Sequence, residues 1–138
     1  MITAYLNFNG NTEEVFNFYK SAFSGEISSL QRFGDTPHGD QMSAEDKNKI
    51  MHIRLEASNG VDLMGSDYMD FAGQPFNAGN NFALSVHPES EAAADHLFQA
   101  LSAGGNVTMP LGKVFWGAYF GMFKDKYGIN WIINYQYK

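Results

Sequence analysis

The stretch Phe115–Asn134, FWGAYFGMFKDKYGINWIIN, carries the clearest structural pattern in the chain. It predicts two strands joined by a tight turn, because aromatic and β-branched residues, which strands favour, flank a polar segment that ends at Gly128. Gly128 supplies the positive φ that such a turn usually needs. The stretch Ile50–Asp67, IMHIRLEASNGVDLMGSD, has the same design around the pair Asn59 and Gly60. Two hairpins of one design indicate a duplicated fold.

A helix is expected before each hairpin. In the first half, apolar residues recur at helical spacing after Asn11, the expected N-cap, and the helix is expected to end at Gly25. In the second half, Pro88 and Glu89 are expected to start the helix, and Gly104 follows its end. Alternating or β-rich segments lie on either side of each helix. The order strand, helix, strand, strand, strand therefore occurs twice.

This order predicts an α+β fold of two tandem βαβββ modules. The first module covers about residues 1–67, a linker covers about 68–80, and the second module covers about 81–138. One βαβββ unit leaves a face of its sheet uncovered, so two units must pair, within one chain or across a dimer.

Composition narrows the classes of function. With 138 residues the chain has the size of one domain, and its net charge of -6 argues against nucleic acid as a partner. No apolar run reaches the roughly 18 residues that a membrane span needs, and the start resembles no signal peptide, so a cytoplasmic protein is expected. Because the chain has no cysteine, disulfides and Cys-ligated metals are excluded.

Short motifs extend along almost the whole chain in a fixed order. They are Tyr5-Leu6-x-Phe8-x-Gly10-Asn11, Phe18-Tyr19, Phe33-Gly34-Asp35 with Pro37, Ile50-Met51-His52, Leu63-Met64-x-Ser66-Asp67, Trp116-Gly117 with Tyr119 and Gly121, and Asp125-x-Tyr127-Gly128-x-x-Trp131. By this set the chain is identified as a member of the PhnB-like (demethylubiquinone methyltransferase-like) branch of the glyoxalase/bleomycin resistance/dioxygenase, or vicinal oxygen chelate, superfamily. The resemblance implies a cupped, largely antiparallel sheet with helices packed outside, a ligand in the cup, and a homodimer.

The resemblance also implies where a metal would be held. The four superfamily ligand positions, usually His or Glu, correspond here to Thr3 or Ala4, Met64, Asn81 and Ile132. Alanine and isoleucine have no donor atom, a thioether is soft, and a lone amide binds weakly. We therefore expect no metal and no other cofactor.

Strand periodicity predicts which residues face the cup. If Met64 and Ile132 point inward, every second residue on their strands does too. The predicted ligand-binding residues are Tyr5, Asn7, His52, Arg54, Asp62, Met64, Ser85, Trp116, Tyr119, Ile132 and Asn134. Alternatively, these residues face solvent or a dimer interface, and Trp116 and Tyr119 fill the space between modules.

Among the predicted cup residues, His52 and Arg54 are the two that could take part in catalysis or hold a charged group. Histidine suits acid–base work near neutral pH, and an arginine on the same face could hold a carboxylate or phosphate. The alternative for His52 is a structural, hydrogen-bonded role. No serine lies in the motif that exposes a catalytic nucleophile.

Three hypotheses follow. The first is a metal-free, dimeric protein that binds an unidentified small molecule in its cup. The second is a lyase, isomerase or dioxygenase-type enzyme that uses the same cup, either metal-free with His52 as acid–base or with metal ligands that the alignment misses. The third is a structural or partner-binding dimer with a filled cup.

Overall fold

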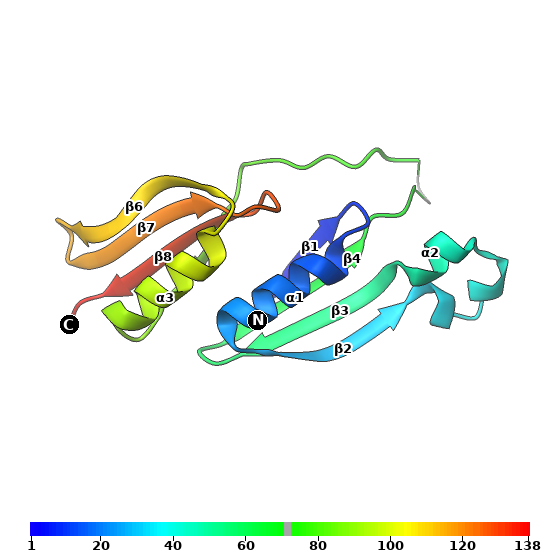
Figure 1. The fold of residues 1–138 in the computed structure, drawn as a ribbon, viewed down its shortest axis with the longest axis horizontal. Coiled ribbons are helices and arrows are strands. Elements are labelled where there is room, and N and C mark those ends of the chain that lie inside the picture. The colour runs from blue at the N-terminus through cyan, green and yellow to red at the C-terminus, as the bar shows by residue number, and fades with distance from the viewer. Residues whose placement is uncertain (71–72) are drawn as a thin grey trace. The chain divides into compact units, whose positions relative to one another are not determined.

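The computed structural model describes residues 1–70 and 73–138, in which the chain forms two compact units, Met1–Phe76 and Asn77–Lys138. Each unit has one four-stranded sheet, and one long helix lies against it (Figure 1). The α+β prediction is confirmed. In the predicted linker, residues 73–80 form no helix or strand, and residues 71 and 72 lie outside the described residues.

The first unit follows the predicted order, with two short 3-10 helices, η1 (Phe33–Asp35) and η2 (Gly39–Gln41), and one short α-helix added between β2 and β3. Its elements are β1 (Ala4–Phe8), α1 (Thr12–Phe23), β2 (Glu26–Arg32), α2 (Ala44–Asn48), β3 (Ile50–Ala57) and β4 (Val61–Asp67). The sheet order is β1-β4-β3-β2, with β1 parallel to β4 and the other pairs antiparallel. The N-cap of α2 is Ser43, whose side chain accepts from the N–H of Asp46.

The second unit has the same topology. Its elements are β5 (Leu84–Val86), α3 (Glu91–Ser102), β6 (Asn106–Val114), β7 (Ala118–Lys124) and β8 (Asn130–Gln136). The sheet order is β5-β8-β7-β6, with β5 parallel to β8. Because the position of every strand matches its counterpart in the first unit, the two units are repeats of one design.

The cores lie between each sheet and its helix. In the first unit the helix-bearing face buries Leu6, Phe8, Ile53, Leu55 and Leu63 against Phe16 and Tyr19 of α1. In the second unit it buries Phe123, Trp131 and Ile133, and Leu101 of α3 is buried too. Burial of one such side chain stabilises a fold by about 1.5–3 kcal/mol. The opposite face of each sheet, called here the first or second open face, is half-buried or exposed along the same strands.

A glycine allows each long helix to approach its sheet. A Cβ atom at Gly65 of β4 would lie 2.8 Å from the ring of Phe16 on α1, and one at Gly121 of β7 would lie 2.7 Å from the ring of Phe98 on α3. Both distances are shorter than real contacts of Cβ atoms. The two glycines therefore set the helix-to-sheet distance in the two units.

The hairpin turns match the sequence prediction. Asn59 and Gly60 both have positive φ, 63° and 75°, and Gly128 has φ 94°. The β7–β8 turn is also held by Asp125, which is only 3% exposed. Its Oδ1 accepts from the backbone N–H groups of Tyr127 and Ile129 at 2.8 and 3.0 Å, and its Oδ2 accepts from Trp131 Nε1 at 2.8 Å.

The predicted cap of α1 is wrong. The backbone of Asn11 has φ -121° and ψ 23°, and its side chain makes no capping hydrogen bond. The first N–H of the helix, that of Thr12, instead donates to Oδ1 of Asp67 at the end of β4, at 3.0 Å. Asp67 Oδ2 accepts from the N–H of Ile50, the first residue of β3, at 2.7 Å. One buried carboxylate thus ties α1, β3 and β4 together.

Two other helix ends differ from the prediction by one to three residues. Helix α3 begins at Glu91, after Pro88 and Glu89, because the side chain of Ser90 accepts from Ala93 N–H at 3.1 Å and acts as the N-cap. Helix α1 ends in the left-handed conformation at Ser24, with φ 52°, one residue before Gly25.

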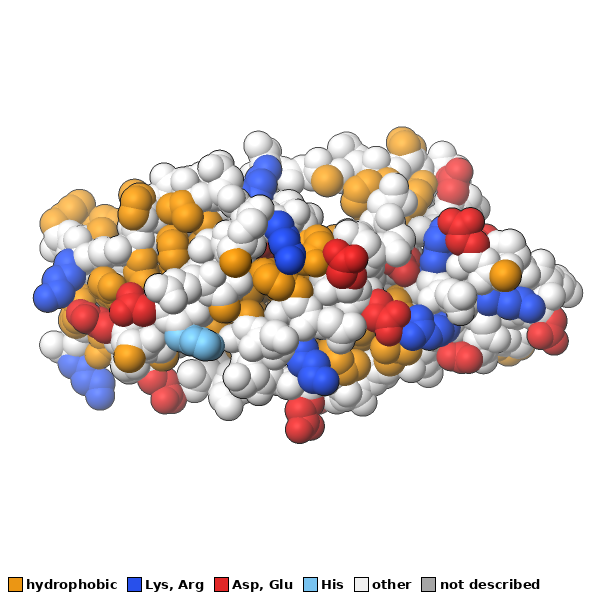
Figure 2. All heavy atoms as spheres, in the orientation of Figure 1, with side chains coloured by type: hydrophobic (Ala, Val, Ile, Leu, Met, Phe, Trp, Pro, Cys, Tyr) orange, Lys and Arg blue, Asp and Glu red, His pale blue; other side chains and the backbone are white. Residues whose placement is uncertain are grey.

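Charged side chains do not gather in one patch on the face drawn in Figure 2, where acidic and basic groups lie side by side over the first unit. No helix among the described residues is long and apolar enough to cross a membrane.

Candidate functional site

The first open face brings together six of the predicted site residues. Strand pairing places Tyr5 opposite Met64, and Met64 opposite Arg54. Asp62 follows on β4, while Asn7 and His52 continue the face along β1 and β3. Asn7 Oδ1 accepts from Ser66 Oγ at 2.9 Å. This face is therefore polar, with one thioether and one aromatic ring.

Arg54 is already paired, contrary to the predicted role as an anion holder. Its Nε and Nη2 donate to the two carboxylate oxygens of Asp62 at 2.8 and 2.9 Å, and Nη2 also lies 3.5 Å from Glu56 Oε1. The hydrogen bond from Arg54 holds the pKa of Asp62 below its ordinary value, and the same bond raises the pKa of Arg54. The guanidinium charge is thus neutralised within the protein.

His52 lies half-buried on β3, with its ring 6.1 Å from the ring of Tyr5 at a tilt of 48°. A general base must reach the proton that it abstracts at about 2.6–3.2 Å, directly or through one water. Within the described residues, no hydrogen bond joins the His52 ring to a nucleophile or an orienting carboxylate. The surroundings of His52 therefore resemble a binding surface more than a catalytic pair.

The second open face carries Ser85, Ile132 and Asn134. Ile132 lies between Ser85 on β5 and Met122 on β7, and Phe120 lies opposite Asn134. Ser85 Oγ is 3.2 Å from Nε2 of His87. The Oδ1 atom of Asn134 is buried and has no hydrogen-bond partner within the described parts of the chain.

Tyr119 does not share this face, which corrects the predicted site. It pairs with Tyr135 across β7 and β8, and its hydroxyl donates to Asp95 Oδ1 of α3 at 2.7 Å, so it lies on the helix-bearing side. That bond and burial raise the pKa of Tyr119. The alternation of side chains along β7 could have predicted the face of Tyr119. Tyr119 is an even number of residues from the buried Phe123, so the two side chains lie on the same face.

Trp116 lies in the β6–β7 turn at one end of the second open face. Its ring is 5.0 Å from that of Phe115 and 5.4 Å from that of Phe120, both in edge-to-face arrangements. Phe115 is almost fully exposed and Trp116 is about half exposed. The three rings form an aromatic cluster that borders this face.

A cavity of about 720 Å³ lies on the second unit, at the other end of the open face. It is lined by Asn80, Asn81, Phe82, Ala83, Asn106, Thr108, Met122, Phe123, Lys124, Asn130 and Trp131. Its size falls within the range of pockets that hold small molecules, about 300–1,000 Å³. Most of these residues were not predicted, although Met122 of β7 pairs with Ile132 of β8 and shares its face, and strand alternation places Lys124 on that face too.

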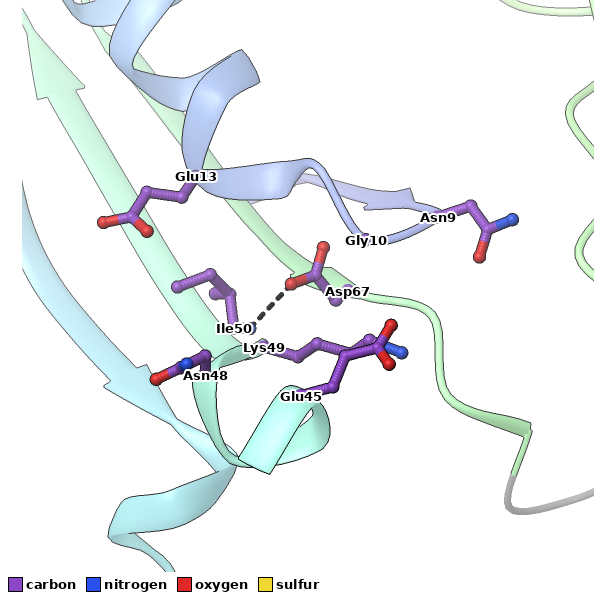
Figure 3. Close-up of a pocket in the computed structure, with 8 residues that line it drawn as sticks. All are labelled: Asn9, Gly10, Glu13, Glu45, Asn48, Lys49, Ile50 and Asp67. Atoms are coloured by element: carbon purple, nitrogen blue, oxygen red, sulfur yellow. Dashed lines mark hydrogen bonds between the residues drawn. The ribbon is translucent and has the colours of Figure 1, made fainter. Parts of the chain in front are cut away.

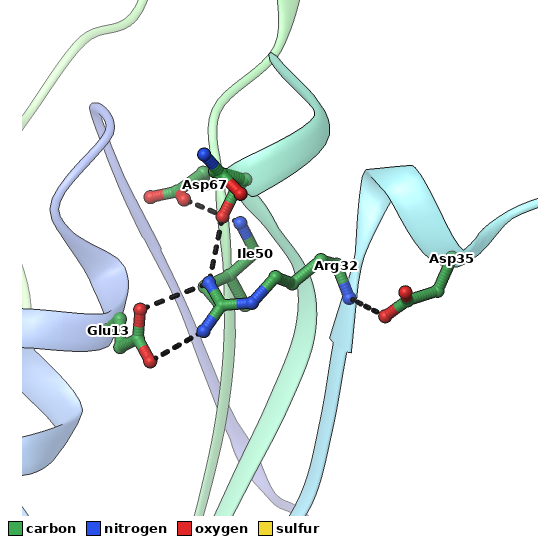
Figure 4. A network of polar contacts seen from close by, with 6 residues as sticks. Glu13, Arg32, Asp35, Ile50 and Asp67 are labelled. Carbon is green, nitrogen blue, oxygen red and sulfur yellow. Dashed lines mark hydrogen bonds and ion pairs between the residues drawn. The ribbon is translucent and has the colours of Figure 1, made fainter. Parts of the chain in front are cut away.

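A smaller pocket of about 420 Å³ lies on the first unit where α1 begins (Figure 3). Its charged residues mostly have structural partners. Asp67 binds two backbone N–H groups, and Lys49 is paired with Asp46 at 3.2 Å. Glu13 is held by Arg32, whose Nη1 and Nη2 donate to its two oxygens at 3.1 and 2.8 Å (Figure 4).

Arg32 connects α1 to the segment before β3. Besides Glu13, it donates from Nη1 to the carbonyl of Asn48 at 2.9 Å, and its backbone N–H donates to Asp35 at 3.1 Å. The bond to Glu13 raises the pKa of Arg32. The network fixes the segment between β2 and β3, so we assign the smaller pocket to the framework of the fold.

The superfamily metal positions do not fit a metal ion. Ala4 pairs with Leu63, a residue of the helix-bearing face, so only Thr3 of the two candidates has the parity of Met64. The four positions then offer a hydroxyl, a thioether, an amide and an alkyl group, without imidazole or carboxylate. Across residues 1–70 and 73–138, no three His, Asp or Glu side chains form a group that could hold a metal.

Two βαβββ repeats, each with a helix on one face of its sheet, define the glyoxalase/bleomycin resistance/dioxygenase fold. A solved domain of that description from Frankia sp. EAN1pec shares it with a TM-score of 0.68 and 16% identity, over 99% of this chain and 96% of that one. The fold prediction is confirmed.

The chain belongs to the family described as 3-demethylubiquinone-9 3-methyltransferase, whose model matches residues 1–134. It is 39% identical to protein PA1353 from Pseudomonas aeruginosa, with a TM-score of 0.86 over 100% of this chain and 98% of that one. It is 31% identical to the PhnB protein from Bacillus cereus, with a TM-score of 0.76 over 97% and 98% of the two chains. The predicted PhnB-like resemblance is confirmed.

Proposed function

We propose that this chain is a metal-free protein that binds a small molecule on the second open face. The observation that carries the proposal is the cavity of about 720 Å³, which combines amide side chains with the apolar side chains of Phe82 and Met122. Small-molecule sites in proteins have this composition, with an apolar lining and a few polar groups that orient the ligand.

Binding is favoured over methyl transfer, the activity in the family's description. A methyl donor related to nucleotides usually binds an open parallel sheet with a glycine-rich first loop. In the described residues each sheet has a single parallel pair, β1 with β4 and β5 with β8. Binding also needs no catalytic group, and no partner for acid–base work by His52 is found among residues 1–70 and 73–138.

A thermal-shift screen with small soluble compounds tests the proposal. A ligand at 100 times its Kd stabilises the folded protein by about 2.7 kcal/mol, so the best compounds should raise Tm by several degrees. In Met122→Trp the larger side chain projects into the cavity and obstructs it, which should abolish this rise. Leu30→Trp, the control, introduces the same side chain at an exposed site on β2 and should retain the ligand-induced rise in Tm.

Two results would contradict the proposal. One is a rise in Tm that is equally large in Met122→Trp and in the parent protein, which would place the ligand elsewhere. The other is stoichiometric metal in untagged protein after incubation with zinc, nickel, manganese or iron(II), because the residues at the four superfamily positions should leave the protein without bound metal.

A further inference from the structure

We infer that the cavity of the second unit selects a planar ligand with hydrogen-bond donors and acceptors on its ring edge and one negatively charged group. This inference rests on the proposed function, because it names the class of molecule that the site takes. Three properties of the lining carry it: its carboxamides, its apolar surface and its single charge.

Four of the lining side chains are carboxamides, those of Asn80, Asn81, Asn106 and Asn130. Each offers one acceptor oxygen and two N–H donors. Asn130 uses one N–H to reach the carbonyl of Phe82 at 3.4 Å, which leaves its oxygen and second N–H for a ligand. A carboxamide pairs best with a group that both donates and accepts, such as a ring amide or imide.

The apolar part of the lining suits a flat ring. Phe82 is 50% exposed, so its aromatic face is available for stacking. Met122 is half-buried on β7, and its flexible thioether adapts to the shape of a ligand. A planar heterocycle can contact these two side chains with its face and the asparagines with its edge.

The only ionisable side chain in the lining belongs to Lys124, which is exposed. No salt bridge reaches it from the described part of the chain. Lys124 pairs directly with Asn130 across β7 and β8, so the two Cβ atoms lie about 4.5–5.5 Å apart. An ammonium and a carboxamide at this spacing match a compact ring that carries an anionic substituent.

Three probe compounds separate these requirements. Orotate is a planar imide with a carboxylate on the ring, uracil has the imide edge without the charge, and benzoate has the carboxylate without the edge. Titration calorimetry should give orotate a Kd at least tenfold lower than that of uracil or benzoate. Only orotate can bind both the asparagine carboxamides, through its imide edge, and the ammonium of Lys124, through its carboxylate.

Two variants assign the contacts. Asn130→Leu should lower the affinity for orotate at least tenfold and leave the affinity for benzoate unchanged. Lys124→Met should lower the affinities for orotate and benzoate and leave that for uracil unchanged. Matched controls on α1, Asn17→Leu and Lys20→Met, remove the same groups from exposed positions and should change none of the three affinities.

The outcomes distinguish this inference from the proposed function. Benzoate binding as tightly as orotate, or orotate binding that is indifferent to both variants, overturns the ligand class while the cavity remains a binding site. Failure of all three probes also overturns the class when other compounds raise Tm in the screen. If the screen itself yields no binder, the proposed function fails as well.

Discussion

The two units share one topology but use their buried carboxylates differently. In the first unit Asp67 joins the start of α1 to the start of β3, and the hairpin turn is formed by Asn59 and Gly60, both with positive φ. In the second unit Asp125 holds the hairpin turn, and α3 is capped by its neighbour Ser90. A repeated fold therefore conserves the order of its strands without conserving which polar group secures each junction.

The helices are also tied to their sheets by different chemistry. Glu13 of α1 pairs with the guanidinium of Arg32, whereas Glu91 and Asp95 of α3 accept from the hydroxyls of Tyr137 and Tyr119. The first tie is an ion pair, and the second depends on protonated phenols. The two units should respond differently to mutation and to pH.

The largest effect is expected for Asp125→Ala. Loss of this side chain removes the carboxylate that accepts from two backbone N–H groups and from the buried indole N–H of Trp131, which should lower the free energy of unfolding by about 3–5 kcal/mol. Urea denaturation, followed by tryptophan fluorescence, measures this change in the free energy of unfolding. Asp40→Ala, at an exposed site, should stay within about 0.5 kcal/mol of the parent, and a similar value for Asp125→Ala would contradict the anchoring role.

The contrast between remote and local capping predicts an intermediate effect. Asp67→Ala leaves two buried N–H groups unpaired and should cost about 2–4 kcal/mol, whereas Ser90→Ala removes one exposed capping bond and should cost about 1 kcal/mol. The same denaturation experiment compares them. Equal losses in the two variants would show that Asp67 acts only as an ordinary cap.

The smallest effect concerns pH. Burial and the bond to Glu91 raise the pKa of Tyr137 from 10.0 to about 12. Because the folded state favours the neutral phenol, its contribution to stability is complete below pH 10 and is lost as the pH rises through about 12. An ultraviolet titration of phenolate should show a late phase that loses the contribution of one phenol in Tyr137→Phe and is unchanged in Tyr5→Phe, while Tyr119, whose pKa is also raised, titrates late in both variants. An equal late phase in Tyr137→Phe and in the parent protein would contradict this assignment.

Much of the fold was predictable because it depends on local patterns. The turns at Asn59-Gly60 and Gly128 follow from the need for positive φ, and the two-residue period of the strands separates Leu55 and Ile133 from Arg54 and Ile132. These rules depend only on residues that are close together in the sequence, so they can be applied to one sequence alone.

The rest depends on contacts between distant residues. Asn11 has the right type and place for a cap, yet the first N–H of the helix, that of Thr12, donates to Asp67, 55 residues away. Arg54 has the right face for an anion, but Asp62 on the adjacent strand neutralises it. The cavity is lined partly by Asn80 and Asn81, which belong to no strand, so no periodicity could assign them to a face.

The dependence of α1 on Asp67 has a consequence for the order of events during synthesis. Helix α1 leaves the ribosome early, but the group that completes its first turn is translated 55 residues later. Closing so long a loop costs more chain entropy than forming the local cap of α3. The helix nearest the N-terminus should therefore become stable only after β4 has emerged, whereas α3 can form as soon as its own residues are available.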